Sequence, residues 1–463
     1  MKKMKIGSLL ILSLVLVLVL AACGGNSGGN TGSNSGNNAT TPANNAGDGG
    51  EQPAEVVQAP AEEAAAVDLG GRTIRIGAWW DDTPVGDTAG GLARLDKIEE
   101  LQEKYNMKIE FINVPFDEYM DKFTTTVLAG EPFADVAIME FKRAIVPVKD
   151  GLVLPISEFA LGNSDINNEQ KLTVKLPPLG GGEYSFNKAG GVSVVGLHYN
   201  RDLFTKLGLP DLQEIYASGE WTWEKFMEVA KLATRDTDND GKTDSFGFSG
   251  WPADTARHFG ATNDAKFVDD ATFLEGISDP KMIETLEFVN RISNVENVAK
   301  VKTGNKMDWN ETNTFKDGDV AMAIMYDWNL SDLPFEVGVV PIPKGPSGTG
   351  QYTYANTALN GWFIPKGVKD PQIVFQIFEE MQDVPPTEEY PGQDWLESRY
   401  THESDIRMAI DHINGTGMVS VEEGIPDFPF YGMMDEIIIE NKSVSAVVES
   451  RKSEGQAALD KLK

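Results

Sequence analysis

The segment that decides the fold begins at Thr73-Ile74-Arg75-Ile76-Gly77, a β-branched run typical of a strand. Apolar side chains then recur at helical spacing between Leu92 and Tyr105, and Lys108 to Val114 returns to a strand pattern. A strand, a helix and a second strand in this order predict a sheet with crossover helices. The same alternation continues along the chain, so we expect an α/β fold.

The helix over Leu92 to Tyr105 should bury one stripe, formed by Leu92, Leu95, Ile98, Leu101 and Tyr105. The patterns predict a helix that follows Phe116, has Asp117 as its N-cap and stops at Gly130. A further helix should be capped by Thr222, with Trp221 packing on Phe226. The remaining predicted elements are strands over Asp135 to Met139, Phe335 to Val340 and Gly361 to Ile364, and helices near Pro371 to Met381 and Val444 to Leu462.

The amino terminus has the features of a secretory signal. Three lysines within Met1 to Lys5 precede an aliphatic run, which ends in Leu20-Ala21-Ala22-Cys23. This ending resembles the lipobox of bacterial lipoproteins, which implies that residues 1–22 are removed and that Cys23, the only cysteine, carries the lipid. A spanning helix is the weaker alternative, because about fifteen apolar residues fall short of the roughly twenty that a bilayer needs.

Residues 23–66 are rich in Gly, Asn, Ser and Thr, so we expect a disordered tether. Such a long tether favours an anchor on the outer face of the cell membrane. Roughly 395 residues then remain, more than one core usually organises, which predicts two lobes. The net charge of −31 disfavours nucleic acid and anionic lipid as partners.

Ligands of open α/β sheets bind beyond the carboxyl ends of the strands, and there this chain repeatedly places an indole beside a carboxylate or an amide. Such pairs suit a saccharide, whose apolar face stacks on a ring while its hydroxyl groups bond to the polar partner. For each residue alone, packing in the core is the competing interpretation. The binding candidates are Trp79, Trp80, Asp81, Glu140, Trp251, Asp327, Trp328, Asn356 and Trp362, with Asn360 as a lesser one.

A second motif, Asp236-Thr237-Asp238-Asn239-Asp240-Gly241-Lys242-Thr243-Asp244, reproduces most of a calcium loop. The ligands would be the carboxylates of Asp236, Asp238, Asp240 and Asp244 and the carbonyl of Lys242. Gly247 stands where an EF-hand has its bidentate glutamate, so we expect one structural Ca²⁺ in a surface loop without the helix pair of a sensor. A solvated acidic turn is the alternative.

The order of segments resembles the family 1 extracellular solute-binding proteins of bacterial ABC sugar importers. The resemblance runs through most of residues 72 to 382. The matching segments include Lys104-Tyr105-Asn106-Met107-Lys108-Ile109, Val114-Pro115-Phe116-Asp117-Glu118-Tyr119, Leu197-His198-Tyr199-Asn200-Arg201-Asp202, Thr222-Trp223-Glu224-Lys225-Phe226, Val337 to Gly345 and Gly361-Trp362-Phe363-Ile364-Pro365-Lys366.

The resemblance implies a two-lobed periplasmic-binding-protein-like fold, in which each lobe is a mixed sheet flanked by helices and the hinge is crossed more than once. It places the crossings near Val194 to Tyr199 and Ala355 to Gly361. The N-terminal lobe would comprise residues 69–195 and 360–395, and the C-terminal lobe residues 196–359 and 396–463. Residues 383 to 440 lie largely beyond the match, and they form either a cap on the cleft or a surface elaboration.

The expected function is that of a monomeric, lipid-anchored binding protein that is not an enzyme. It captures a saccharide between its lobes and delivers it to an ABC permease. Two alternatives stay open: an anchored glycoside hydrolase, which needs only two carboxylates at a fixed separation, and an accessory lipoprotein that binds ligand to signal. A Ser-His-Asp site is disfavoured because the four histidines have no motif around them.

Overall fold

The computed structural model describes residues 67–158, 174–175, 177–180, 182–186, 194–357, 359–390, 392–414 and 417–463. The predicted signal segment, the tether and Cys23 lie outside these residues. Residues 65–463 belong to one compact unit. None of the helices within the described ranges combines the length and apolar character that crossing a bilayer requires.

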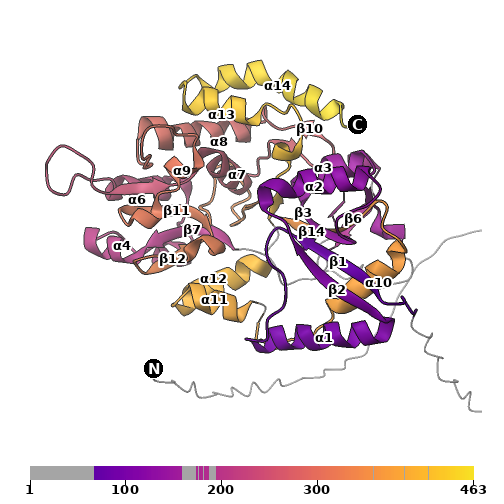
Figure 1. Cartoon of the computed structure of the whole chain (residues 1–463). Coiled ribbons are helices and arrows are strands. Elements are labelled where there is room, and N and C mark those ends of the chain that lie inside the picture. The colour runs from indigo at the N-terminus through magenta and orange to yellow at the C-terminus, as the bar shows by residue number, and fades with distance from the viewer. Residues whose placement is uncertain are drawn as a thin grey trace, which may run out of the picture. The chain divides into compact units, whose positions relative to one another are not determined.

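The first sheet gathers strands from distant parts of the chain in the order β2-β1-β3-β14-β6-β5, with β4 paired to β14. Its strands are β1 (Arg72–Ala78), β2 (Met107–Asn113), β3 (Val136–Glu140), β4 (Val153–Leu154), β5 (Val174–Lys175), β6 (Glu183–Phe186) and β14 (Asn360–Pro365). β1 runs parallel to β2 and β3, whereas β14 is antiparallel to its neighbours. Figure 1 shows β14, in orange, among the indigo and purple strands of the amino-terminal part.

The second sheet has the order β12-β7-β11-β8. It consists of β7 (Val195–Asn200), β8 (Phe246–Ser249), β11 (Val320–Tyr326) and β12 (Val337–Val340). β7 pairs antiparallel with both β11 and β12, and β8 pairs parallel with β11, so this sheet is mixed as well. Two short pairs join β9 (Val268–Asp269) to β10 (Leu274–Glu275) and β13 (Ala355–Asn356) to β15 (Met418–Val419).

The helices cover these sheets. They are α1 (Ala89–Tyr105), α2 (Phe116–Leu128), α3 (Phe141–Lys149), α4 (Arg201–Leu207), α5 (Leu212–Ala217), α6 (Trp223–Ala233), α7 (Pro252–Thr262), α8 (Pro280–Asn290), α9 (Trp309–Thr312), α10 (Pro371–Met381), α11 (Gln393–Arg399), α12 (Glu403–Asn414), α13 (Phe430–Ile438) and α14 (Val444–Asp460). The first sheet with α1, α2, α3 and α10 is the first lobe, and the second sheet with the other helices is the second lobe. The chain passes between the lobes after β6, after β13 and after α10.

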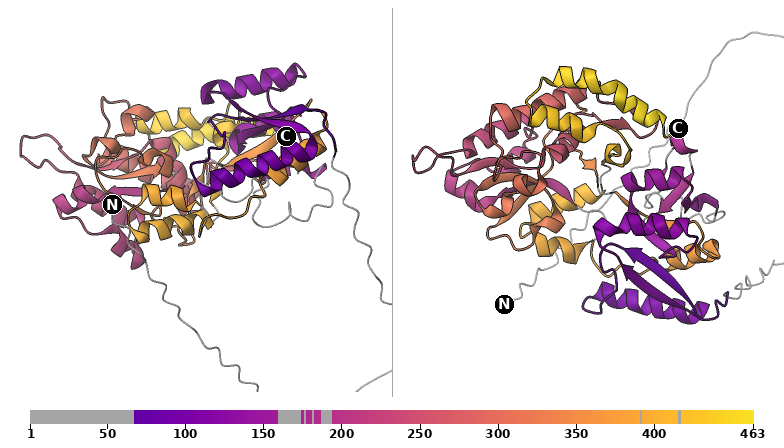
Figure 2. Two further views of the ribbon diagram at one scale, coloured as in Figure 1. Left: turned by 60° about the horizontal axis from the view of Figure 1, so that its bottom comes forward. Right: turned by 45° about the horizontal axis from the view of Figure 1, so that its top comes forward.

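The second sheet is buried on both faces. Leu197 and Tyr199 of β7 pack into one core with α4 and α6. Val339 of β12 packs into another core with Leu396 of α11 and with Tyr400, which directly follows that helix. The segment α11–α12 is therefore part of the second lobe. The last helices, α13 and α14, lie against α7 and α8, as Figures 1 and 2 show in yellow and salmon.

The local signals of helix α6 are confirmed. Thr222 caps the helix by accepting from the Lys225 N–H, and Trp221 lies with its ring 6.4 Å from that of Phe226. The predicted cap of α2 is wrong: the helix already begins at Phe116 after the extended Pro115, and Asp117 lies in its first turn. A carboxylate there still interacts favourably with the positive end of the helix dipole.

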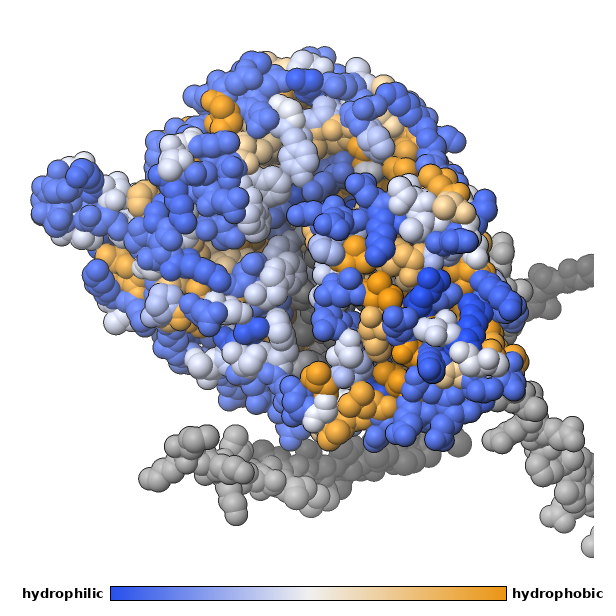
Figure 3. Space-filling model, in the orientation of Figure 1, coloured by the Kyte–Doolittle hydropathy of each residue, from blue (hydrophilic) through white to orange (hydrophobic). Residues whose placement is uncertain are grey.

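The apolar stripe predicted for α1 is only partly buried. Leu101 and Tyr105 are in the core, whereas Leu92 and Leu95 are 52% and 37% exposed. The helix begins at Ala89, three residues before the predicted start. Figure 3 shows a largely hydrophilic face with apolar residues gathered mainly over the part formed by α1, α2, β1 and β2.

Candidate functional site

The residues that follow β1 form an aromatic cluster at the end of the first sheet. Trp79 is half-buried, and its ring meets the rings of Trp80 and Phe116 edge-on at 5.3 and 5.5 Å. Trp80 is 39% exposed and so presents an indole surface to solvent. Asp81 is exposed, and hydrogen bonds with the side chain and the backbone N–H of Thr83 lower its pKa. The loop therefore offers an open indole beside an ionised carboxylate.

Glu140 closes β3, and cations surround it. Arg143 Nε lies 2.7 Å and Lys142 Nζ 3.6 Å from its carboxylate oxygens. The Arg143 guanidinium also covers the ring of Phe116 at 4.0 Å, so Glu140 is joined to the cluster that follows β1. Asn360 of β14 stands opposite Glu140 in the antiparallel register. An acid, an amide and two cations thus meet at one strand end.

A second aromatic cluster surrounds Trp251 at the start of α7. Its ring centre lies 5.9 Å from that of Trp309 and 5.7 Å from that of Tyr431. Trp309 is 41% exposed. The Tyr431 hydroxyl donates to Glu423 at 2.7 Å, and Lys142 of the first lobe reaches the same carboxylate at 2.7 Å. Glu423 therefore connects the surroundings of Glu140 to the Trp251 cluster.

Buried charge holds this junction in place. The Arg257 guanidinium donates to Glu422 at 2.6 Å and to Asp254 at 2.7 Å, and it lies 3.4 Å from Glu423. Burial opposes the charge on Arg257, but the three carboxylates hold its pKa well above the ordinary value. Burial alone would raise the pKa of Glu423, whereas Lys142 and Arg257 lower it to about 2. Arg257 and Glu423 therefore both carry their charges at neutral pH.

The backbone approaches closely at the same junction. Glu422 and Glu423 belong to a short 3-10 turn, η6 (Glu422–Gly424), which lies against α3. A Cβ on Gly424 would come 1.7 Å from the carbonyl oxygen of Lys142, so only glycine fits there. This turn from the C-terminal part of the chain thereby touches both lobes.

Asp327 and Trp328 follow β11 at the end of the second sheet. Asp327 is 2% exposed, and its Oδ2 accepts a hydrogen bond from Trp395 Nε1 at 2.8 Å. Burial raises the pKa of Asp327, and the bond from Trp395 opposes this effect. Trp328 is 42% exposed and stacks on Tyr326, with ring centres 4.2 Å apart and an interplanar angle of 10°.

These clusters converge on the strand ends of the two lobes. The Tyr326 hydroxyl bonds to Thr357, which lies on the segment that leads into Asn360 and hence to Glu140. Burial raises the pKa of Tyr326, whose ring lies 6.1 Å from that of His258 on α7. From Glu140, ion pairs through Lys142 and Glu423 lead to Arg257, the neighbour of His258. The joint role of the two strand ends in binding stays a prediction.

Trp362 does not belong to this group. It lies within β14 and not beyond its end, it is 8% exposed, and its ring packs 5.0 Å from Phe378 of α10. Burial in the core of the first lobe leaves no face for a ligand, so this candidate is corrected to a packing residue. Asn356 is half-buried on β13, next to Ala355, whose N–H bonds to His258 Nδ1.

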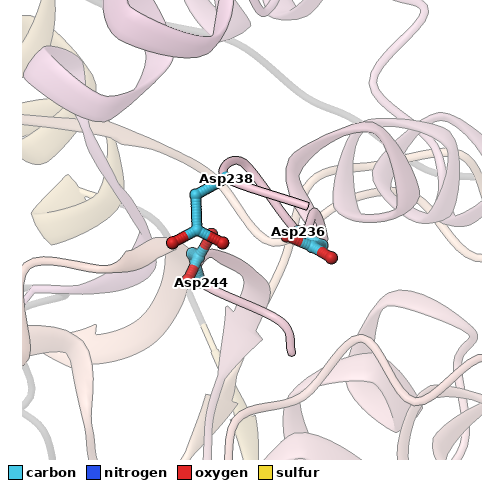
Figure 4. Close-up of side chains that lie close together, drawn as sticks. All are labelled: Asp236, Asp238 and Asp244. Atoms are coloured by element: carbon cyan, nitrogen blue, oxygen red, sulfur yellow. The ribbon is translucent and has the colours of Figure 1, made fainter. Parts of the chain in front are cut away.

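The acidic loop between α6 and β8 brings three of its predicted ligands together. One carboxylate oxygen from each of Asp236, Asp238 and Asp244 lies within 4.8 Å of the others, and all three residues are exposed. Figure 4 shows Asp238 and Asp244 facing each other, with Asp236 from the start of the loop. Asp240 is not in this group: it accepts from the Lys242 N–H at 2.8 Å and lies 3.4 Å from Lys242 Nζ.

The same carboxylates also shape the loop without an ion. Asp236 accepts from the N–H groups of Asn239 and Gly241 at 2.6 and 2.8 Å. Asp244 accepts from the N–H and the hydroxyl of Thr237, both at 2.7 Å, and these bonds lower its pKa. A donor set of three hard carboxylate oxygens fits Ca²⁺ and does not fit softer metals.

Sequence reasoning missed four residues that build the junction, Lys142, Arg257, Glu423 and Tyr431. The charged three carry no local signal, because their meaning depends on partners up to 281 residues away. Tyr431 and Trp395 stand in the segment that sequence reasoning left open between a cap and a surface elaboration. Their aromatic character was the available clue.

Solved structures with the same fold are sugar-binding proteins by name. An ABC substrate-binding protein of Listeria monocytogenes, solved with cycloalternan, gives a TM-score of 0.59 at 16% identity and covers 84% of this chain and 99% of its own. The GacH receptor of Streptomyces glaucescens gives 0.59 at 15% identity, covering 85% and 100%. The maltose/maltodextrin-binding domain of Bdellovibrio bacteriovorus, bound to maltotriose, gives 0.56 at 16%, covering 84% and 99%. These likenesses show the fold, which is that of two-lobed binding proteins.

Sequence comparison identifies the family. Curated protein sequences give no match. The profile of the bacterial extracellular solute-binding proteins matches residues 86–383, which is more than half of the chain. Proteins of this kind bind their solutes without converting them, so the glycoside hydrolase alternative is set aside. The chain is a member of the bacterial extracellular solute-binding protein family.

Proposed function

We propose that this solute-binding protein captures a saccharide between its two lobes and delivers it to an ABC permease. One observation carries the proposal: each lobe has an exposed indole just beyond a strand end, Trp80 or Trp328, next in the chain to a carboxylate, Asp81 or Asp327. Stacking surfaces beside hydroxyl-binding groups are what a sugar ring needs.

The similar structures support the same ligand class. Besides those bound to cycloalternan and maltotriose, others of this fold hold tagatose, mannotriose and maltotetraose. Their ligands differ in size and linkage, so they support a saccharide and not one particular sugar. Closure of the lobes over the ligand would favour the bound form, because contacts made only in the closed state shift the population toward it.

A thermal-shift screen tests ligand capture. The panel contains tagatose, mannobiose, mannotriose, maltotriose, maltotetraose and cycloalternan, with sorbitol as a control for nonspecific stabilisation. A ligand that binds only the native state raises the midpoint of thermal unfolding. At a ligand concentration of one hundred times Kd, the free energy of unfolding increases by about 2.7 kcal/mol. A screen in which no sugar exceeds the sorbitol control contradicts the saccharide proposal.

We further propose that Cys23 anchors the protein by lipid at the extracellular face of the cell membrane. The signal-like run and the lipobox-like ending Leu20-Ala21-Ala22-Cys23 support the proposal. Radiolabelled palmitate should enter the wild-type chain and not a Cys23→Ser variant. Sugar uptake in a strain lacking this chain separates transport from the sensing alternative, because a sensor would leave uptake intact.

We also propose that the acidic loop holds one structural Ca²⁺ through Asp236, Asp238 and Asp244. The supporting observation is the approach of their three oxygens to within 4.8 Å. Adding CaCl₂ after EDTA treatment should stabilise the protein by about 1.4 kcal/mol at ten times Kd. An Asp238→Asn variant should lose this gain, while MgCl₂ should not reproduce it. Equal midpoints in EDTA and CaCl₂ contradict the proposal.

A further inference from the structure

The segment α11–α12 lies beyond the family profile, which ends at residue 383, and yet it is built firmly into the second lobe. Leu396 of α11 and Tyr400, which directly follows that helix, are buried, and the Tyr400 hydroxyl lies 3.0 Å from His198 Nε2 of β7. Asp405 of α12 is fully buried and bonds to Arg201 at 2.8 Å. These contacts fix the position of α11–α12 on the second lobe, and with it the positions of the side chains that the segment carries.

The segment presents a tryptophan to the end of the second sheet. Trp395 donates its indole N–H to Asp327, and Trp328 follows Asp327 directly in the chain. The bond to Asp327 thus holds the indole of Trp395 beside the residue that directly precedes Trp328. Both indoles remain open to solvent, with Trp328 42% and Trp395 43% exposed.

Each of these indoles is supported on one face. Trp328 stacks on Tyr326, and the Arg399 guanidinium lies 4.1 Å from the ring centre of Trp395. A ring that is backed on one side and exposed elsewhere loses little conformational entropy when a ligand stacks on it. Large, rigid aromatic anchors of this kind are the residues that dominate binding energy.

We propose that Trp395 forms, with Trp328, an added stacking subsite that makes the protein selective for oligosaccharides over monosaccharides. This inference rests on the proposed saccharide function. A ligand of one ring can use one indole, whereas a longer chain reaches the second. Trp395 then acts by contact with an outlying sugar unit, and Asp327 fixes the orientation of its indole.

Isothermal calorimetry on the full-length protein tests the subsite with two length series: mannose, mannobiose and mannotriose, and glucose, maltose, maltotriose and maltotetraose. In the series that the wild type binds, Trp395→Ala should weaken the longest ligand about tenfold or more and the shortest less than about twofold. Trp395→Phe keeps an aromatic face but loses the bond to Asp327, and it should restore most of the lost affinity. Arg407→Ala, at an exposed position of α12, is the matched control and should change no affinity.

The outcomes separate the two proposals. A wild type that binds no saccharide overturns the saccharide function and the subsite together. If the wild type binds sugars, the subsite alone is overturned by any of three results: no loss with Trp395→Ala, an equal loss at every chain length, or a Phe variant as weak as the Ala variant. The last two results would mean that Trp395 acts only through Asp327. Near-ultraviolet circular dichroism of each variant verifies that the fold is retained.

Discussion

The ends of the two sheets hold their acids in opposite ways. Glu140, at the end of β3, lies among cations and belongs to a charge network that continues through Lys142 and Glu423 to Arg257. Asp327, at the end of β11, is buried and held by the N–H of an indole. Ion pairs hold the carboxylate of Glu140 in place, whereas packing and one hydrogen bond hold that of Asp327. The first should therefore respond strongly to changes of charge, and the second to changes of shape.

The largest effect should come from removing the central cation of the network. Arg257→Met leaves Glu422 buried without its partner, so we expect a loss of about 3 to 5 kcal/mol in the free energy of unfolding. Urea denaturation measures this loss. At the other sheet end, Asp327→Asn keeps the shape and an acceptor for Trp395, and it should cost less than about 1 kcal/mol.

Arg407→Met is the matched control for Arg257→Met. Arg407 pairs with Glu403 at 2.6 Å, but both side chains are largely exposed. Such a pair contributes little, so this variant should stay within about 0.5 kcal/mol of the wild type. Equal losses for the two arginine variants would remove the distinction between the sheet ends.

The next effect is a difference in saccharide binding between two exposed indoles, of which one stacks on another ring and the other does not. Trp328 is backed by the Tyr326 ring, whereas Trp80 meets Trp79 only edge-on. We expect Trp328→Ala to lose about 2 to 3 kcal/mol of saccharide binding and Trp80→Ala about 1 kcal/mol, each with an unchanged unfolding midpoint. Calorimetry with the sugar identified by the screen measures both. A greater loss at Trp80 would contradict the importance of the stacked support.

The last effect is a pH dependence of stability at the charged end. The pKa of Glu423 is lowered from its usual 4.5 to about 2, so its ionised form stabilises the fold above pH 4.5. This stabilisation declines as the pH falls from about 4.5 toward 2, and after allowance for solvent screening it amounts to about 1.5 kcal/mol. Glu423→Gln should remove this part of the acid sensitivity, as urea titrations at pH 5 and pH 3 would show. An identical pH profile in the variant would exclude Glu423 as its source.

Much of the fold was predictable because local patterns specify it. The strands at the start of the chain appear within about two residues of their predicted ends, and α10 has the predicted bounds Pro371–Met381. Alternation and helical spacing are properties of a few neighbouring residues, so one sequence suffices to detect them. The exposed half of α1 could not be predicted, because exposure depends on what the rest of the chain places over a helix.

The site was predictable only where a residue directly follows a strand. The positions of Trp80, Glu140 and Trp328 at strand ends were predicted in this way, and their binding role stays a prediction, whereas Trp362 lies within β14 with its ring buried. The partners that orient the acids come from far along the chain. Trp395 lies 68 residues from Asp327, and no periodicity links the two. Contacts of this kind depend on the tertiary fold and not on local pattern.

The position of β14 in the first sheet has a consequence for synthesis. β14 lies between β3 and β6, but it follows β3 by more than two hundred residues. While a ribosome makes the intervening second lobe, on the order of 10 to 40 seconds at usual elongation rates, the edge of β3 has no permanent neighbour. An open edge is where chains pair with one another and aggregate. The nascent chain therefore needs either a chaperone or export before folding, and the order of strands imposes that need.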